Sequence, residues 1–231
     1  MEIRLQAVDI HKTFILHLQG GKRLNVLKRV DLTVEAGECV ALTGPSGIGK
    51  STFLKILYGN YKPDSGRVLI YHLGQWINTV EAEPYQILDI RRSTIGYVSQ
   101  FLRVIPRVPA IEIVMEPLQR LGLSVQECRV RAEELLRRLN LSESLWTVSP
   151  TTFSGGEQQR VNLARSLIYP YSILLLDEPT ASLDEKNRAI VVQLIQEAKR
   201  RGTAVVGVFH DRTVREALAT RYFNLSMEES G

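Results

Sequence analysis

A glycine-rich stretch at residues 44–51, GPSGIGKS, constrains most strongly how this chain can fold. It fits the pattern G-x-x-x-x-G-K-[ST] at every fixed position, the spacing of loops that bind phosphate between a strand and a helix. Residues 38–43 (ECVALT) predict a short buried strand before the loop, and 50–58 (KSTFLKILY) carry apolar residues at helical spacing after it. The glycines therefore fall at a strand-to-helix turn of an α/β protein.

Glycine suits this turn because it adopts backbone angles closed to other residues and lets several N–H groups converge on phosphate oxygens at the positive end of a helix. Lys50 would reach the β and γ phosphates, the hydroxyl of Ser51 would ligate Mg²⁺, and Thr52 would hold the α phosphate. A glycine-rich turn without a ligand is the weaker alternative, since the strand and the helix are both present. The candidate nucleotide-binding residues of the loop are Gly44, Ser46, Gly47, Gly49, Lys50, Ser51 and Thr52.

Composition is that of an ordinary soluble globular protein, with 231 residues, 44% of them hydrophobic and 23% charged. No apolar run approaches the about 18 residues of a membrane helix, and the N-terminus lacks a signal-peptide pattern, so we expect a cytoplasmic protein without direct membrane insertion. Cys39 and Cys128 are far apart and predict small core residues. The net charge of +4 is weak evidence for nucleic acid, because attraction for a polyanionic nucleotide explains it equally well.

Apolar patterning predicts strands alternating with helices, interrupted by a helical insertion. The strands are expected at residues 3–8, 26–34, 67–71, 94–99, 172–177 and 203–209, with a hairpin signal at Gly20-Gly21 in the first connection. Helical spacing covers 110–141, with Pro117 and Gly122 as punctuation, and a further helix is expected at 185–199. Residues 72–89 look irregular and polar, with Trp76 as their apolar anchor.

Polar residues follow three of these strands. Asp177 and Glu178 come at the end of an apolar run typical of a central parallel strand, and His210 ends the last one. Ligands of open α/β sheets bind at this carboxyl edge, which favours Asp177 as a Mg²⁺ ligand and Glu178 as a base that orients water. Gln100, at the end of the strand at 94–99, could complete the Mg²⁺ shell. The alternative for each is an ordinary turn residue.

Two further features each leave two interpretations open. Ser154 is a good N-cap with Glu157 three residues later, so residues 154–157 predict a well-capped helix. The alternative is a second phosphate-binding site, because Gly155 and Gly156 leave the N–H groups at the start of this helix exposed. Phe14, upstream of the hairpin, is either a core residue or an aromatic ring that stacks on adenine.

Taken in order, GPSGIGKST, Gln100, SGGEQQR, ILLLDEP, ASLD and His210 resemble the ATP-binding subunit of the ATP-binding cassette (ABC) superfamily, from Phe14 to about Arg221. The resemblance implies an ABC-type P-loop ATPase with a RecA-like parallel-sheet core, an N-terminal antiparallel β subdomain and a helical subdomain that carries the signature motif. Residues 1–231 would form one ATP-binding domain, with 101–170 as the helical subdomain and 1–100 and 171–231 as the core and the antiparallel subdomain.

The resemblance also implies a head-to-tail homodimer with two ATP molecules in its interface and Mg²⁺ beside them. Ser51, Gln100 and Asp177 would hold the metal, Glu178 would polarise the attacking water, and His210 would contact the γ phosphate. Ser154, Gly155 and Gly156 would act on the ATP of the partner, Asp184 would shape the interface, and Phe14 would stack on adenine. Phe153 replaces a commoner leucine and Glu157 a commoner glutamine; neither change puts ATP binding in doubt.

Less generic stretches resemble the PhnL-type cassette subunit of the bacterial carbon-phosphorus lyase system, which degrades phosphonates. They are KTFILHLQGGKRLNVL, the Trp76 segment, RRSTIGYVSQFLRVIPRV, TTFSGGEQQRVNLARS and VVGVFHD. This resemblance implies an ATPase that works with the lyase core subunits and a sister ABC subunit, at the step that joins phosphonate to the ribose of ATP and forms α-D-ribose 1-methylphosphonate 5-triphosphate. The alternative is the motor subunit of a membrane transporter of the lipoprotein-release or export type. DNA-repair and translation cassettes are disfavoured, because the chain lacks a long coiled coil or a second cassette.

Overall fold

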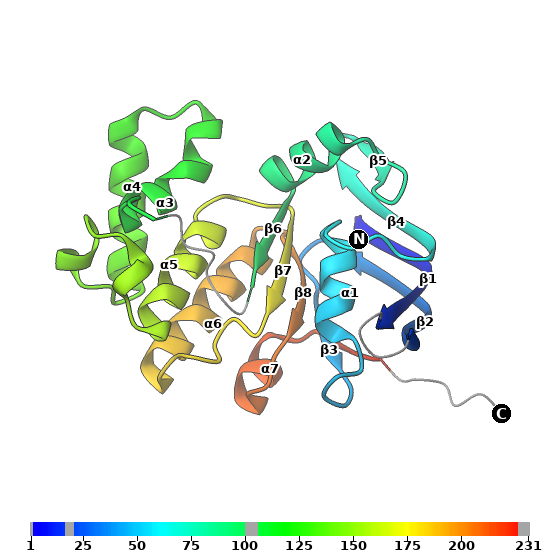
Figure 1. The fold of residues 1–231 in the computed structure, drawn as a ribbon. Helices are drawn as coiled ribbons and strands as arrows, with labels where there is room; N and C mark the ends of the chain where they lie inside the picture. Colours follow the sequence, from blue (N-terminus) through cyan, green and yellow to red (C-terminus); the bar gives the residue numbers. More distant parts are fainter. Residues whose placement is uncertain (1, 17–20, 100–105, 226–231) are drawn as a thin grey trace.

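The structure, a computed structural model, describes residues 2–16, 21–99 and 106–225. Figure 1 shows an antiparallel sheet on one side, a parallel sheet in the middle and a group of helices on the other side. This arrangement confirms the expected α/β class, with a parallel core, an N-terminal antiparallel sheet and a helical insertion.

The antiparallel sheet has the strand order β2-β1-β4-β5. Its strands are β1 (Ile3–Leu16), β2 (Lys22–Glu35), β4 (Ser65–His72) and β5 (Gln75–Asn78). The first two are longer than predicted, since their pairing runs from Ile3 opposite Glu35 to Leu16 opposite Lys22. The start of β2 is exposed and polar, so it carries no alternation of apolar residues from which the outer half of the hairpin could be predicted.

The parallel sheet has the order β6-β7-β8-β3-β9. Its strands are β3 (Cys39–Thr43), β6 (Ile95–Val98), β7 (Ile173–Asp177), β8 (Ala204–Val208) and β9 (Arg221–Asn224). Every residue of β7 is buried: Ile173 and Leu175 belong to one hydrophobic core, and Leu174 and Leu176 to the other. The uninterrupted apolar run therefore reflects a strand that is covered on both faces.

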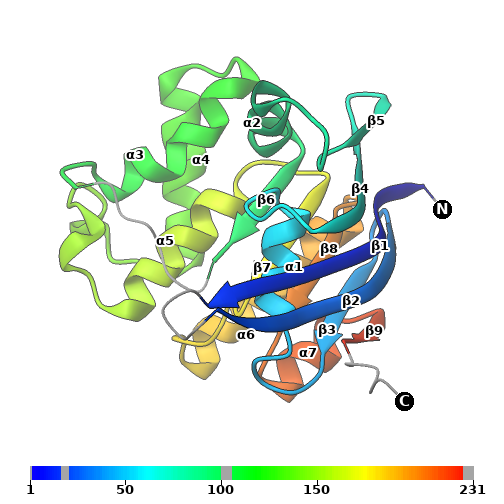
Figure 2. The same ribbon diagram turned by 45° about the vertical axis from the view of Figure 1, so that its right-hand side comes forward.

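Helices supply both covers. α1 (Lys50–Leu57) lies between the two sheets, where Phe53 and Leu54 share a core with residues of both (Figure 2). α5 (Gly155–Leu167) and α6 (Glu185–Arg200) contribute to the core on the opposite face, with α3 (Ala110–Met115) and α4 (Val125–Arg138) beyond them. The helical insertion is thus confirmed. Pro117 lies in η2 (Glu116–Leu121), a 3₁₀ segment that follows α3, and Gly122 ends it in the left-handed conformation.

Three details differ from the sequence prediction. Residues 72–89 are not irregular, because they contain β5 and most of α2 (Pro84–Ser93), and Trp76 is 43% exposed instead of being an apolar anchor. A signal for α2 was present: Pro84 stands at the first helical position, and Glu83 and Gln86 form a capping box. Four further elements have no counterpart among the predicted ones. They are α7 (Arg212–Leu218), β9 and the short 3₁₀ turns η3 (Glu143–Leu145) and η4 (Pro150–Thr152).

The prediction for the two cysteines is confirmed, because both are buried and free. Burial raises the pKa of the Cys39 thiol to about 12, which keeps it protonated and unreactive. Within the ranges that the structure describes, no helix is both long enough and apolar enough to cross a bilayer.

Candidate functional site

The carboxyl ends of β3, β7 and β8 meet at one edge of the parallel sheet, and the glycine-rich loop lies there. A pocket of about 190 Å³ opens between the loop and the residues that follow β7 and β8. Its described lining consists of Ser46, Gly47, Gly49, Lys50, Ser51, Thr52, Glu178, Val208 and His210. The structure therefore brings together residues that are more than 120 positions apart in the sequence, as in Ser51 and Asp177, which share a hydrogen bond.

The loop has the backbone that phosphate binding requires. Gly44, Gly47 and Gly49 all have positive φ, and a Cβ on Gly49 would lie 2.5 Å from a methyl carbon of Val26. Gly49 is the N-cap of α1, with no side-chain cap and no acidic residue in the first turn, so the helix start leaves its N–H groups for a ligand. The ammonium group of Lys50 donates to the carbonyl oxygens of Gly44 and Pro45, both at 2.8 Å, which places its charge inside the loop.

A buried carboxylate lies beside the start of α1. Asp177, 6% exposed, accepts hydrogen bonds from the hydroxyls of Ser51 at 2.9 Å and Tyr97 at 3.1 Å. A hydroxyl and a carboxylate are oxygen ligands of the kind that Mg²⁺ prefers. In the part of the chain that the structure describes, no group of three His, Cys, Asp or Glu side chains could hold a metal ion, so a metal here would need ligands from outside this set, such as phosphate oxygens and water. These residues fit Mg²⁺ bound together with a nucleotide.

Tyr97 was not singled out from the sequence. Its pKa is raised, first by burial and then by the negative charge of Asp177, so its hydroxyl stays protonated and donates to that carboxylate. Residues 95 and 97 of β6 share a face, the one turned toward the core that contains α1. In a strand, side chains point alternately to opposite faces of the sheet. This alternation along the predicted strand at 94–99 was the signal from which the position of Tyr97 could have been predicted.

Glu178 and His210 meet at the opposite wall of the pocket. Glu178 has a φ of +53°, and its carboxylate oxygen Oε1 lies 2.6 Å from Nε2 of His210. The backbone N–H of Glu178 donates to the carbonyl of Val208, which ties the end of β7 to that of β8. A carboxylate at this position, 20% exposed beside the loop, can accept a proton from a water molecule.

The remaining predicted residues lie elsewhere. Ser154, Gly155 and Gly156 start α5 with the predicted capping box, and as far as the chain is described they do not line the pocket. Asp184 caps α6 by accepting from the N–H of Asn187 at 2.8 Å. The rings of Phe14 and Tyr61 form a T-shaped pair with centroids 5.6 Å apart. Gln100 lies outside the described residues.

Two buried polar residues of α5 that the sequence did not flag join this helix to the sheet edge. The amide of Gln159 donates to the carbonyl of Pro179 at 3.0 Å, and that of Asn162 to the carbonyl of Ser99 at 2.8 Å. Buried polar side chains nearly always have a hydrogen-bond partner. The positions of Gln159 and Asn162 among apolar residues of the helix were therefore the signal from which such bonds could have been predicted.

Comparisons with known proteins agree with this geometry. The family described as ABC transporter matches residues 27–181, which is more than half of the 231 residues. The lipoprotein-releasing system ATP-binding protein LolD of Legionella pneumophila (strain Paris) is 37% identical over 94% of this chain and 92% of its own length. The histidine/lysine/arginine/ornithine transport ATP-binding protein HisP of Escherichia coli (strain K12) is 34% identical over 100% of this chain and 90% of its own.

Among solved structures, the ATP-binding cassette MJ0796 superposes with a TM-score of 0.85 at 35% identity, covering 96% of this chain and 94% of the other. It is described as dimeric, in one case as a post-hydrolysis state bound to ADP and Pi. The expected ABC ATPase fold is therefore confirmed. Sequence family, fold and the site at the sheet edge agree, and the chain belongs to the ABC transporter family as one of its ATPase domains.

Proposed function

We propose that this chain hydrolyses ATP at the described pocket and that hydrolysis drives a partner protein. One observation carries the proposal: at the rim of one phosphate loop, Ser51 is hydrogen-bonded to the buried Asp177, while Glu178 and His210 meet across the pocket. In family members of this fold, ATP is bound with Mg²⁺.

Each residue has a role that its position supports. Lys50 and Thr52 bind phosphates, helped by the loop residues Gly44, Ser46, Gly47 and Gly49, and Ser51 and Asp177 hold the metal. When bound, the metal would supply positive charge against the phosphate oxygens. Glu178 takes the proton of the attacking water, and His210, within hydrogen-bonding distance of it, contacts the terminal phosphate.

We propose further that two copies close head to tail around ATP. The pocket of about 190 Å³ is smaller than the roughly 300–1,000 Å³ typical of small-molecule sites, which favours a second surface that covers part of the nucleotide. The glycine-flanked start of α5 lies outside its own chain's pocket and offers N–H groups, which suits Ser154, Gly155 and Gly156 to a partner's ATP. The dimeric state of the similar MJ0796 supports this arrangement, in which Asp184 shapes the interface and Phe14 stacks on adenine.

For the partner, we propose a membrane permease of the lipoprotein-release or export type. Its support is the similarity over nearly the whole chain to proteins named for lipoprotein release and amino-acid transport. The carbon-phosphorus lyase remains a second candidate. It rests only on the five sequence stretches that resemble the PhnL-type subunit, and the names of these relatives lend it no support.

Glu178→Gln tests the ATPase proposal, because it removes the base and leaves the phosphate loop intact. Size-exclusion chromatography with Mg-ATP should show this variant as a trapped dimer without turnover, and Lys50→Ala as a monomer. Glu185→Gln, on the first turn of α6, is the matched control and should turn over like the unchanged chain. Full hydrolysis by Glu178→Gln would remove its role as base, and a monomer in Mg-ATP would contradict the dimer.

The partner is tested separately. A tagged copy at native expression level is purified from detergent-treated cells grown on a phosphonate, and the co-purifying chains are identified by mass spectrometry. A polytopic membrane protein in stoichiometric amount is the expected result. Soluble lyase subunits in its place would overturn the permease assignment and establish the second candidate, while leaving the ATPase proposal untouched.

A further inference from the structure

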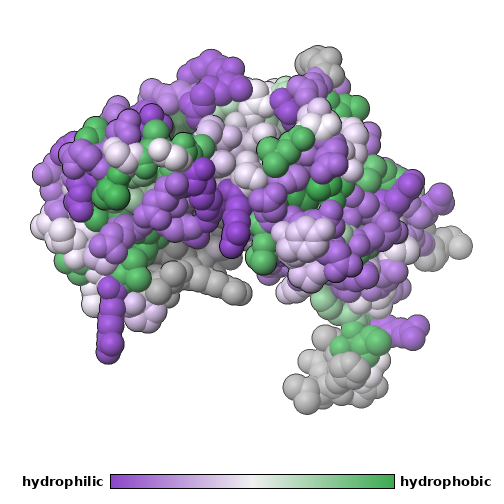
Figure 3. Space-filling view, turned by 90° about the horizontal axis from the view of Figure 1, so that it is seen from above, coloured by the Kyte–Doolittle hydropathy of each residue, from purple (hydrophilic) through white to green (hydrophobic). Residues whose placement is uncertain are grey.

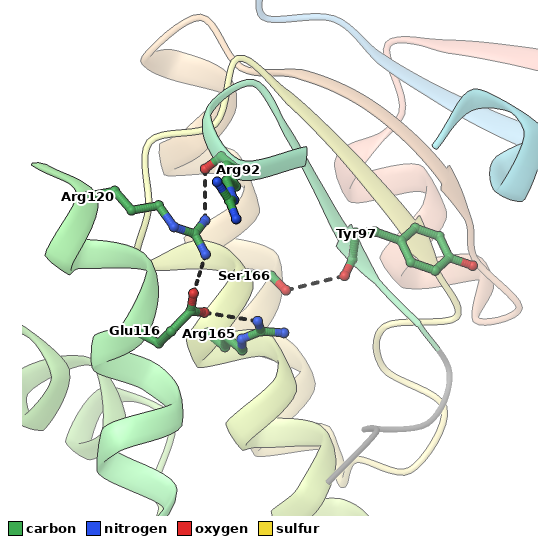
Figure 4. A network of polar contacts seen from close by, with 6 residues as sticks. All are labelled: Arg92, Tyr97, Glu116, Arg120, Arg165 and Ser166. Atoms are coloured by element: carbon green, nitrogen blue, oxygen red, sulfur yellow. Dashed lines mark hydrogen bonds and ion pairs between the residues drawn. The ribbon is translucent and has the colours of Figure 1, made fainter. Parts of the chain in front are cut away.

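Polar contacts join the helical insertion to the sheet core at more than one place. Figure 3 looks onto the side of the molecule where α2 lies, and hydrophilic side chains border the hollow between its two lobes. Figure 4 shows the joint near the end of α5, a set of ion pairs and hydrogen bonds among Arg92, Tyr97, Glu116, Arg120, Arg165 and Ser166. A second joint lies at the start of α6, where the amide of Asn140, just after α4, donates to Asn187 at 3.0 Å. The residue that follows Asn187 extends this second joint toward the proposed ATP site.

That residue is Arg188, and it connects the loop before α6 with the loop after β8. Its Nε donates to the backbone carbonyl of Leu183 at 3.0 Å, and its Nη1 lies 2.5 Å from Oδ2 of Asp211. Leu183, 4% exposed, comes directly before Asp184, and Asp211 comes directly after His210. One guanidinium group therefore ties the loop that is proposed to shape the dimer interface to the segment that carries the proposed phosphate contact.

Both carboxylate oxygens of Asp211 are engaged. While Oδ2 pairs with Arg188, Oδ1 accepts from the backbone N–H of Val214 at 3.1 Å and caps the start of α7. These bonds lower the pKa of Asp211, first the one from Val214 and then the one from Arg188, so the carboxylate stays charged near neutral pH. Asp211 is therefore held between α6 on one side and α7 on the other.

The ring of His210 depends on this support. Its side chain is 63% exposed, and its Nε2 lies 2.6 Å from Oε1 of Glu178. Because an exposed ring has few packing contacts to fix it, its position follows that of the backbone on either side. On one side Phe209 is buried in the core, and on the other Asp211 is held by Arg188. Loss of the Arg188 bond would therefore release one of the two flanks of His210.

The loop before α6 also lies against the start of α5. A Cβ on Gly156 would be 2.9 Å from the backbone carbonyl oxygen of Ser182, so the helix start and the loop are in close contact. This helix start is the one proposed to contact the ATP of the partner. Since Arg188 holds the next carbonyl of the same loop, that of Leu183, it links this surface to Asp211.

We infer that Arg188 is a positioning residue for ATP hydrolysis. Through Asp211 it holds His210 at the terminal phosphate, and through the Leu183 carbonyl it ties that position to the loop before α6. This inference rests on the proposed function and deepens it, since it names the side chain that links the proposed dimer interface to the phosphate contact. The described lining of the pocket beside the phosphate loop includes Lys50 and not Arg188, so loss of Arg188 should lower the turnover number and leave the affinity for ATP nearly unchanged.

The first test compares Arg188→Met with Arg212→Met in the full chain. Methionine keeps an apolar stem and removes the guanidinium group. Arg212 is the matched control, because it is an exposed arginine next to Asp211 that pairs with Glu216 within α7. Phosphate release in Mg-ATP should show kcat lowered at least about tenfold in Arg188→Met and unchanged in Arg212→Met, while a fluorescent ATP analogue binds both chains equally. Arg188→Lys keeps a charge beside Asp211 without the planar fork and should give an intermediate kcat.

The second test reports on the ring of His210 without any turnover. The ¹³C–¹H spectrum of the nucleotide-free chain contains ring resonances from four histidines, and His210→Ala identifies those of His210. Arg188→Met should displace or broaden the His210 resonances, whereas Arg212→Met should leave them in place. His72, buried on β4, is the internal reference, because a general loss of packing would move its resonances as well.

The outcomes separate this inference from the proposed function. Unchanged kcat or unchanged His210 resonances in Arg188→Met would overturn the inference and leave the proposed function standing, as would an equal loss of activity in Arg212→Met. Movement of the His72 resonances together with those of His210 would show a structural role alone and overturn it too. An unchanged chain that fails to hydrolyse ATP would contradict the proposed function instead. If urea unfolding shows that Arg188→Met does not fold, Arg188→Lys takes its place in both comparisons.

Discussion

The helices α4 and α5 begin with the same Ser-x-x-Glu capping box, and of these two only α5 is proposed to contact ATP. In α5, the N–H of Glu157 donates to the hydroxyl of Ser154 at 3.3 Å and the Glu157 carboxylate accepts from the N–H of Ser154 at 2.8 Å. In α4, the same bonds between Ser124 and Glu127 measure 3.2 and 2.8 Å. Since losing such a cap costs about 1 kcal/mol, Ser154→Ala and Ser124→Ala should lower the unfolding free energy of the nucleotide-free chain equally.

The ATP-bound dimer should separate the two variants. The hydroxyl of Ser154 would exchange its bond to the Glu157 carboxylate, 2.7 Å long here, for one to a phosphate oxygen of the partner's ATP. Since the Ala variant lacks this bond in both states, the loss per site is the difference between the bond to phosphate, at the upper end of the about 1.5–3 kcal/mol for charged acceptors, and the bond to the carboxylate, at the lower end. That difference is about 1.5 kcal/mol. Two sites give about 3 kcal/mol, or a dimer dissociation constant raised on the order of 100-fold in Ser154→Ala.

Urea unfolding measures the first effect, and analytical ultracentrifugation with Mg-ATP measures the second, with Glu178→Gln in every chain so that no ATP is turned over. Ser124→Ala is the matched control, since it removes the same cap and should leave dimerisation unchanged. A Ser154→Ala dimer as tight as that of Ser124→Ala would refute the contact in trans, whatever the two variants do to stability.

Two further substitutions test the single-chain site. Tyr97→Phe removes a hydroxyl that, like that of Ser51, donates to Asp177. We therefore expect the Mg²⁺ concentration for half-maximal hydrolysis to rise roughly tenfold, while the rate at saturating Mg²⁺ changes little. A large fall in that rate with unchanged Mg²⁺ dependence would count against a positioning role for Tyr97. Gly49→Ala places a Cβ 2.5 Å from a side chain of β2, so calorimetry should detect no nucleotide binding by this variant. The control is Gly74→Ala, at a similar positive φ but with open space around it, which should bind the nucleotide normally. Equal binding by both variants would show that the close approach at Gly49 is unimportant.

Much of the fold could be predicted because its signals are local. The apolar run that ends in Asp177 reflects a strand covered on both faces, and the helical spacing after Lys50 reflects a helix whose apolar residues join one core. The capping box at Ser154 involves residues three apart, so its geometry also follows from the sequence. Parallel strands share one carboxyl edge, which is why Glu178 and His210 could be expected near the phosphate loop before any contact was known.

The rest depends on contacts between distant segments. The hydrogen bond from Tyr97 to Asp177 joins residues 80 positions apart, and that from Gln159 to Pro179 requires the packing of α5 against the sheet edge. No spacing rule encodes such pairs. The arginines are similar: in the sequence they are dispersed and look like solvated helix faces, and only folding places Arg92 and Arg165 in the lining of one pocket.

A single helix connects these features. Over the 13 residues of α5, about 20 Å of helix, Ser154 lies at the start, where a partner's ATP is proposed to bind, and Arg165 and Ser166 lie near the end. Between them, Gln159 and Asn162 hold the carbonyls that follow β7 and β6. Because a helix of this length moves as a rigid element, it cannot shift at its C-terminal end without displacing either its own start or its bonds to the catalytic edge. We therefore expect a movement of α5 to reach both the ATP site of its own chain and the ATP of the partner.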